Sequence, residues 1–116
     1  MFNIVRLEKE NQLKKLVKEQ KKTGGNLHVL FVSPWDEVSN NLLERLDEVY
    51  PPGGLDTNDT LYIVNSFDTP HSFVIWNTNH VPELVQVRSR GNRQQVRKAQ
   101  YATDVFRRLG VNSISP

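Results

Sequence analysis

The chain has 116 residues, of which 37% are hydrophobic and 24% are charged, with a formal net charge of +2. This composition is typical of an ordinary globular domain and excludes a disordered or low-complexity protein. Because the sequence contains no cysteine, it excludes disulfides, thiolate metal sites, thiol nucleophiles and dithiol exchange within these residues. We expect a single domain over residues 1–116.

Location and cofactors are predicted mainly from what the sequence lacks. No apolar run approaches the roughly 20 residues that are needed to cross a bilayer. Residues 1–6 lack the apolar stretch of a signal peptide. We therefore expect a cytoplasmic protein with no membrane contact. The histidines His28, His71 and His80 are too scattered to predict a metal cluster, and we expect no cofactor.

The N-terminal third predicts a helix followed by a buried strand. Residues 8–22 place apolar side chains on one helical face and lysines on the other, and Thr23-Gly24-Gly25 ends this pattern. Residues 27–32 form a nearly continuous apolar run that is rich in β-forming residues. Such a run is typical of a central strand buried on both faces.

A second amphipathic helix is predicted over residues 36–50, because Leu and Val recur there on one stripe. Asp36 suits the N-terminal end of this helix as a cap. The Pro- and Gly-rich residues 51–59 predict a surface loop. Residues 61–64 predict the next strand.

The segment Asp68-Thr69-Pro70 predicts an N-cap followed by proline in the first turn of a short helix that runs through Trp76. We expect Trp76 to pack this helix onto the sheet. A further strand is predicted over residues 83–87 and a turn over residues 89–92. The remainder is ambiguous, because the apolar residues between Val96 and Leu109 fit helical spacing while a strand remains open for the earlier part.

Charge is segregated along the chain. Residues 36–83 contain nine acidic residues and one basic residue, whereas the preceding part contains seven basic and three acidic residues. From Arg88 onward there are seven basic residues and a single acidic one, Asp104. This pattern predicts a dipolar molecule that steers charged partners. The alternative is that solvated helix faces carry one sign of charge.

Two segments carry a resemblance to a known family. The strand that leads into Trp35 and an amphipathic helix resembles the active-site segment of thioredoxins, where Trp precedes Cys-x-x-Cys. Asp36 and Ser39 stand at the two cysteine positions. Residues 79–85 resemble the loop that carries a cis-proline before the family's fourth strand, with Pro82 as that proline.

The resemblance implies an α/β protein with a thioredoxin-like fold, in which helices flank both faces of a central mixed β-sheet. It also implies a short strand at residues 93–97 and then a helix at about residues 100–109, which Gly110 ends. In the family, the residue before the cis-proline offers its backbone to an extended substrate segment. Val81 would take that role here, and the alternative is a simple strand-entry turn at Val81-Pro82.

The sequence therefore predicts a redox-inactive, non-enzymatic protein-interaction or structural module with a protein partner. We expect it to act through a groove between the Asp36 helix start and the Val81-Pro82 loop. The residues predicted to form this groove are Trp35, Asp36, Ser39, His80, Val81 and Pro82. Trp35 is either an exposed anchor or a core residue, and Asp36 and Ser39 have the simpler roles of helix cap and first-turn residue.

Two other functions are open. Arginine and lysine gather around the predicted second turn, which suits a nucleic-acid-associated or charge-steered assembly subunit, although a solvated hairpin is the simpler alternative. The residues of this basic hairpin are Arg88, Arg90, Arg93, Arg97 and Lys98. The third function is a non-redox enzyme, with a Ser39–His80–Asp36 constellation or a glutathione-like ligand in the same groove.

Overall fold

The computed structural model describes residues 3–50, 60–90 and 93–110. The described residues form five strands and four helices in the order β1 (Asn3–Arg6), α1 (Glu10–Thr23), β2 (Gly25–Val32), α2 (Glu37–Val49), β3 (Thr60–Asn65), α3 (Pro70–Ile75), β4 (Glu83–Arg90), β5 (Arg93–Ala99) and α4 (Ala102–Arg108). The loop predicted over residues 51–59 and the turn residues Gly91 and Asn92 lie outside the described residues.

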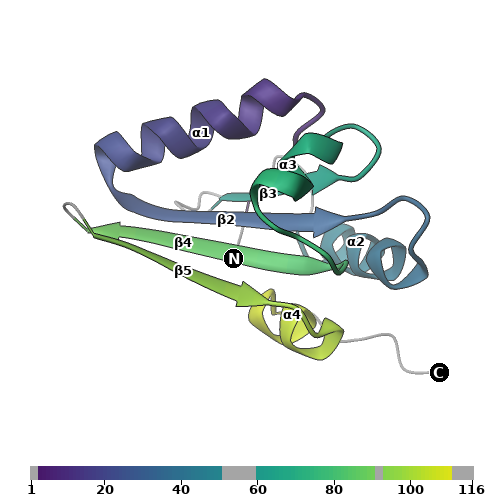
Figure 1. Ribbon diagram of the computed structural model, residues 1–116. Helices are drawn as coiled ribbons and strands as arrows, with labels where there is room; N and C mark the ends of the chain where they lie inside the picture. The colour runs from purple at the N-terminus through teal and green to yellow at the C-terminus, as the bar shows by residue number, and fades with distance from the viewer. Residues whose placement is uncertain (1–2, 51–59, 91–92, 111–116) are drawn as a thin grey trace.

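The strands form one mixed sheet in the order β1-β3-β2-β4-β5. β3 pairs in parallel with both β1 and β2, whereas β4 pairs antiparallel with both β2 and β5. Helices α1 and α3 cover one face of the sheet, and α2 and α4 lie against the other (Figure 1). This is the predicted arrangement of a mixed sheet with helices on both faces.

Strand β2 supplies side chains to two separate cores. Val29 and Phe31 pack on the α1 and α3 side, and Leu30 and Val32 pack on the α2 and α4 side. All four are at most 2% exposed, which explains why the sequence of β2 is continuously apolar from Val29 to Val32. Phe31 also contacts Trp76, with ring centroids 6.1 Å apart, so the prediction that Trp76 packs α3 onto the sheet is confirmed.

Two strand predictions need correction. The sequence did not predict β1, a four-residue edge strand that pairs with Thr60–Ile63 of β3. The turn predicted over residues 89–92 begins too early, because β4 continues through Arg90 and pairs with β5 down to the Arg90–Arg93 pair. The ambiguity after residue 92 is resolved as a strand, β5, followed by the helix α4.

Helix α3 is capped from another helix, which differs from the prediction. Pro70 occupies its first turn as expected, but Thr69 makes no side-chain cap hydrogen bond, and Asp68 instead accepts one from Asn65. The cap comes from Glu10 of α1. One carboxylate oxygen of Glu10 accepts from the His71 backbone N–H at 2.8 Å, and the other accepts from Ser72 Oγ at 2.7 Å. The carboxylate stands at the positive end of the α3 dipole, where negative charge is stabilising.

Candidate functional site

Three loops leave the sheet at the same end. Because β2 and β3 are parallel, the loops that follow them, residues 33–36 and 66–69, both leave at the carboxyl ends of these strands. Strand β4 runs antiparallel to β2 and its first residue pairs with Phe31, so residues 78–82 reach that edge as well. We call these three loops the loop edge. It contains every predicted groove residue except Ser39, which follows in the first turn of α2.

Asp36 and Ser39 form a closed local unit at the start of α2. Asp36 Oδ2 accepts the Ser39 backbone N–H at 2.8 Å and the Ser39 hydroxyl at 2.7 Å. Ser39 is fully buried, and its Oγ also accepts from the Ser33 N–H at 3.4 Å. The prediction that Asp36 caps this helix is confirmed. At the positions that the resemblance assigns to two cysteines, a carboxylate and a hydroxyl are therefore joined by a hydrogen bond.

The predicted Ser39–His80–Asp36 constellation is not assembled in the described structure. The Ser39 hydroxyl donates to Asp36 and lies out of solvent, whereas His80 is exposed. No hydrogen bond between Ser39 and His80 occurs among the described residues. A nucleophilic serine needs an adjacent base and access to substrate, and the geometry of Ser39 provides neither a histidine base nor access.

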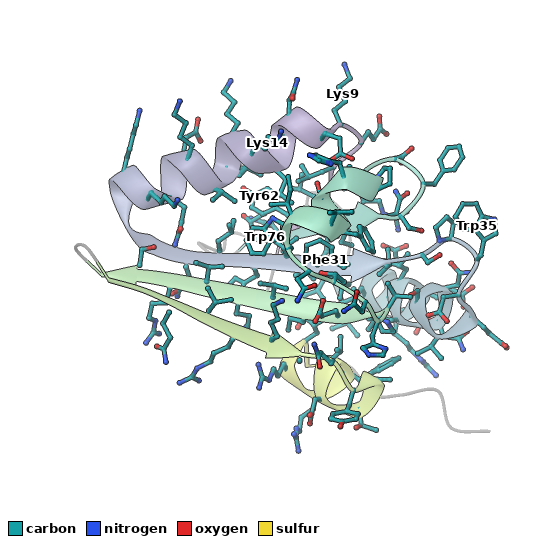
Figure 2. All side chains as sticks on the ribbon, viewed as in Figure 1. Lys9, Lys14, Phe31, Trp35, Tyr62 and Trp76 are labelled. Atoms are coloured by element: carbon teal, nitrogen blue, oxygen red, sulfur yellow. The ribbon has the colours of Figure 1, made fainter. Side chains whose placement is uncertain are left out.

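Trp35 lies on the outside of the molecule. It is 74% exposed, and its ring meets the ring of Phe67, which is 68% exposed, with centroids 6.0 Å apart and planes at 72°. Figure 2 shows Trp35 at the end of the molecule, away from Phe31 and Trp76. The loops that carry the two rings are joined by a hydrogen bond between Ser66 Oγ and Ser33 Oγ at 3.1 Å. Two large aromatic side chains thus form one exposed patch.

The Val81–Pro82 peptide bond is cis. Val81 is half-buried and Pro82 is buried, so the side chain of Pro82 is not available to a partner. Directly after this loop, Glu83 is completely buried. Its Oε1 accepts from Gln100 Nε2 at 3.0 Å, and no described residue donates to its Oε2.

The basic hairpin is divided between two faces of the sheet. Arg88 and Arg97 line the same shallow hollow, whereas Lys98 donates to the Trp76 carbonyl oxygen on the α3 side at 2.8 Å. Arg90 and Arg93 belong to β4 and β5 as backbone partners, and their side chains are outside the described part. The five residues therefore do not form one patch.

The sequence did not identify several residues that share these surfaces. Phe67 was missed because it is a single aromatic in a polar loop, and only the parallel pairing of β2 with β3 brings it to Trp35. His28 was considered as a metal ligand and not as part of a surface, yet its side chain lines the hollow beside Arg88 and Arg97. The alternation of polar residues in β4, at Gln86 and Arg88, and in β2, at Asn26 and His28, is the sequence signal of an open sheet face there.

The described ranges give no support for a metal site or a membrane-spanning helix. Among these residues no group of three or more His, Cys, Asp or Glu side chains is placed to hold a metal ion. None of the helices in the same ranges is long and apolar enough to span a membrane.

The fold is similar to that of solved thioredoxins. Trichomonas vaginalis thioredoxin is similar over 92% of this chain and 95% of its own, with a TM-score of 0.68 at 17% identity. Schistosoma mansoni thioredoxin has a TM-score of 0.69 at 13% identity over 93% of this chain and 94% of its own. Plasmodium falciparum thioredoxin has a TM-score of 0.69 at 13% identity over 94% of this chain and 92% of its own.

These similarities confirm the predicted thioredoxin-like fold. No protein-family model and no curated protein matches the sequence. Within that fold, the 116 residues contain no cysteine, so they have no thiol for the dithiol chemistry that the resemblance implies for thioredoxins.

Proposed function

We propose that this thioredoxin-like protein is a redox-inactive interaction module that binds a segment of a partner protein at the loop edge. The observation that carries the proposal is the exposed Trp35–Phe67 pair. Exposed aromatic rings are unfavourable in water, and Trp is enriched among the residues that dominate binding energy at protein interfaces. A partner that covers both rings would remove a large apolar area from water.

The charge around the aromatic pair indicates the chemistry of the partner. Asp36, Glu37 and Asp68 follow or flank the two rings in sequence, and none of them forms an ion pair with a described residue. A segment that combines an apolar side chain with neighbouring lysine or arginine would pack on the rings and face these carboxylates. Such a segment would be extended if it pairs with the backbone of Val81 in the manner of an added strand.

The loss of sulfur chemistry supports binding as the role of this edge. The Ser39 hydroxyl donates a hydrogen bond to Asp36 and is buried, so the start of α2 presents neither a thiol nor an accessible hydroxyl. The start of α2 is thus a fixed part of this edge, because the Asp36 carboxylate, the Ser39 hydroxyl and the Ser33 N–H are already paired. Fixed surfaces lose little conformational entropy when they bind.

The proposal can be tested with peptides selected from a random library on the intact protein. Affinity would then be measured by the fluorescence of Trp35 in a Trp76→Phe variant, where Trp35 is the remaining tryptophan. Binding at the loop edge should shift the emission of Trp35 to shorter wavelength.

The contribution of single residues is measured in the wild-type background with labelled peptides. Trp35→Ala should weaken peptide binding about 30-fold, the size expected of a hot-spot residue. Val81→Asp should also weaken it.

Tyr101→Ala is the matched control, because Tyr101 is an aromatic with 75% exposure next to α4. It should leave affinity unchanged. Peptides that bind folded Trp35→Ala and Val81→Asp proteins as tightly as the wild type would refute the loop edge as the binding surface.

A further inference from the structure

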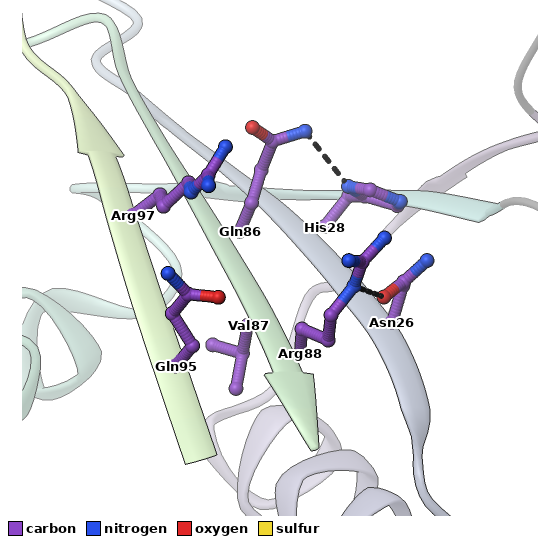
Figure 3. Close-up of a pocket in the computed structure, with 7 residues that line it drawn as sticks. All are labelled: Asn26, His28, Gln86, Val87, Arg88, Gln95 and Arg97. Atoms are coloured by element: carbon purple, nitrogen blue, oxygen red, sulfur yellow. Dashed lines mark hydrogen bonds between the residues drawn. The ribbon is translucent and has the colours of Figure 1, made fainter. Parts of the chain in front are cut away.

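Polar side chains form two rows across three strands on one face of the sheet. In the first row Arg88 of β4 lies between Asn26 of β2 and Gln95 of β5. In the second row Gln86 of β4 lies between His28 of β2 and Arg97 of β5. We call these six residues the polar face, and Figure 3 shows them side by side above the three strands.

The polar face continues the side of the sheet that α2 and α4 cover elsewhere. The next row along the same strands consists of Leu30, Leu84 and Ala99, which are all buried in the core below these helices. Beyond that row the helices end, and in Figure 1 no helix lies over the outer half of β4 and β5 on this side. The polar face lines a hollow of about 170 Å³ instead.

The polar face is positively charged, and the terminal guanidinium nitrogens of its two arginines bond to no described residue. Arg88 Nε donates to Asn26 Oδ1 at 3.2 Å, which orients the guanidinium, while its terminal nitrogens bond to no described residue. Arg97 is exposed and has no hydrogen bond or ion pair within the described ranges. Arg108 reaches in from α4 and donates to Gln86 Oε1 at 3.4 Å. None of the described residues that line the hollow is acidic.

We propose that the polar face is a second binding site, which takes the phosphate groups of a nucleic-acid backbone. Arg88 and Arg97 are diagonal neighbours on adjacent strands, which places the two residues roughly 7–8 Å apart. Two guanidinium groups so placed can each bind a separate phosphate, and the planar guanidinium fork matches phosphate oxygens in pairs. An acidic protein segment would also be attracted, but the amide side chains of Asn26, Gln86 and Gln95 beside the arginines favour a ligand with many hydrogen-bond acceptors and donors.

The polar face contains no Phe, Tyr or Trp side chain among its six members. Stacking of bases on aromatic rings is a main source of affinity and preference in single-strand binding. Without it, the affinity comes from phosphate contacts, which do not depend on base sequence. We therefore expect binding that is independent of sequence and that weakens steeply with salt.

Fluorescence anisotropy with labelled oligonucleotides, single- and double-stranded, tests the site between about 50 and 200 mM salt. The double variant Arg88→Gln/Arg97→Gln should lose at least about tenfold in affinity at low salt. On a single strand its log–log salt slope should fall by about 0.7 for each phosphate that the variant no longer neutralises. The matched control Lys98→Gln/Arg107→Gln removes the same charge, yet Lys98 lies on the other face of β5 and Arg107 pairs with Asp104.

The control should retain most of the affinity and the wild-type salt slope. Equal weakening by both double variants would overturn the site, because net charge alone would then explain binding. No binding by the wild type at low salt would overturn it as well, as would polyglutamate competing better than an oligonucleotide of equal charge. Trp35→Ala should leave oligonucleotide binding intact, so failure of the loop-edge proposal and failure of this one are distinguishable.

Discussion

Asp36 Oδ2 accepts two hydrogen bonds from the same residue, one from the backbone N–H of Ser39 at 2.8 Å and one from its hydroxyl at 2.7 Å. A cap residue ordinarily satisfies one of the free N–H groups in the first turn. Here the carboxylate also satisfies a fully buried hydroxyl. The two residues thus stabilise the start of α2 and keep a polar atom paired inside the protein.

Asp36→Ala should therefore lower the free energy of unfolding by about 2–3 kcal/mol, which combines the loss of a cap with an impaired buried hydroxyl. Asp36→Asn keeps an acceptor and should cost less. Urea denaturation followed by circular dichroism measures both. Glu37→Ala is the control, because Glu37 is an exposed acid in the same turn. An equal loss in Asp36→Ala and Glu37→Ala would show that only charge near the helix start matters.

Glu10 should be needed for the integrity of α3 rather than for that of its own helix. Glu10→Ala removes both acceptors for His71 and Ser72, and we expect a loss of about 1–2 kcal/mol. Hydrogen exchange resolves the effect, because the His71 amide should exchange much faster while the amides of α1 keep their rates. Glu8→Ala, an exposed acid before α1, should change neither. Unchanged exchange at His71 in Glu10→Ala would contradict the cap.

The Tyr50 hydroxyl donates to the Leu109 carbonyl oxygen at 2.7 Å in the buried space between α2 and α4. Burial raises the pKa of the Tyr50 phenol above its ordinary value of 10.0. Below that value the phenol is protonated in both the folded and the unfolded chain. As the pH rises past it, the unfolded chain ionises first, so stability falls until the pH has passed the folded pKa.

Tyr50→Phe should cost about 1 kcal/mol at neutral pH, since it leaves the Leu109 carbonyl without this donor. It should also remove part of the decline in stability at alkaline pH. Unfolding free energies measured for both proteins from neutral pH to above the pKa of an ordinary tyrosine test this. Curves that remain parallel throughout would contradict the role of burial.

Gln100 should stabilise the protein through its hydrogen bond to the buried carboxyl group of Glu83. Its Nε2 is the one donor to the Glu83 carboxyl group among the described residues, at 3.0 Å, and Glu83 is completely buried. Gln100→Ala should lower stability by about 1–3 kcal/mol, because it leaves a buried polar group without its partner. In a Glu83→Leu background the same change should cost little. A similar cost in both backgrounds would mean that Gln100 acts elsewhere.

Most of the fold was predictable because its signals are local. The apolar stripe of α2, the continuous apolar run of β2 and the glycine after α1 each depend on residues close together in the sequence. Asp36 as a cap belongs to the same class, since cap and recipient are three residues apart. The strand β1 was not predictable, because four residues carry no clear period and their stability comes from pairing with β3.

The candidate surfaces divide in the same way. The residues of the loop edge around Trp35 and Val81 were identified from the resemblance of their segments to thioredoxins, but their burial was not predicted. The pairing of Trp35 with Phe67 depends on the parallel register of β2 and β3. The rows of the polar face depend on the antiparallel registers of β4, which separate Arg97 from its neighbour Lys98.

The sequence by itself determined most of the helices and strands and the absence of thiol chemistry in these residues, and it carried a resemblance to thioredoxins that implied the fold. Helical and strand periods, caps and the absence of cysteine are properties of short stretches and of composition, so they can be read without the fold. Only the tertiary structure decided that Ser39 is buried, that Glu10 caps α3, and that two arginines share one open face. Those relationships join residues through burial and strand register, and the free energy of such contacts exists only once the distant segments have packed together.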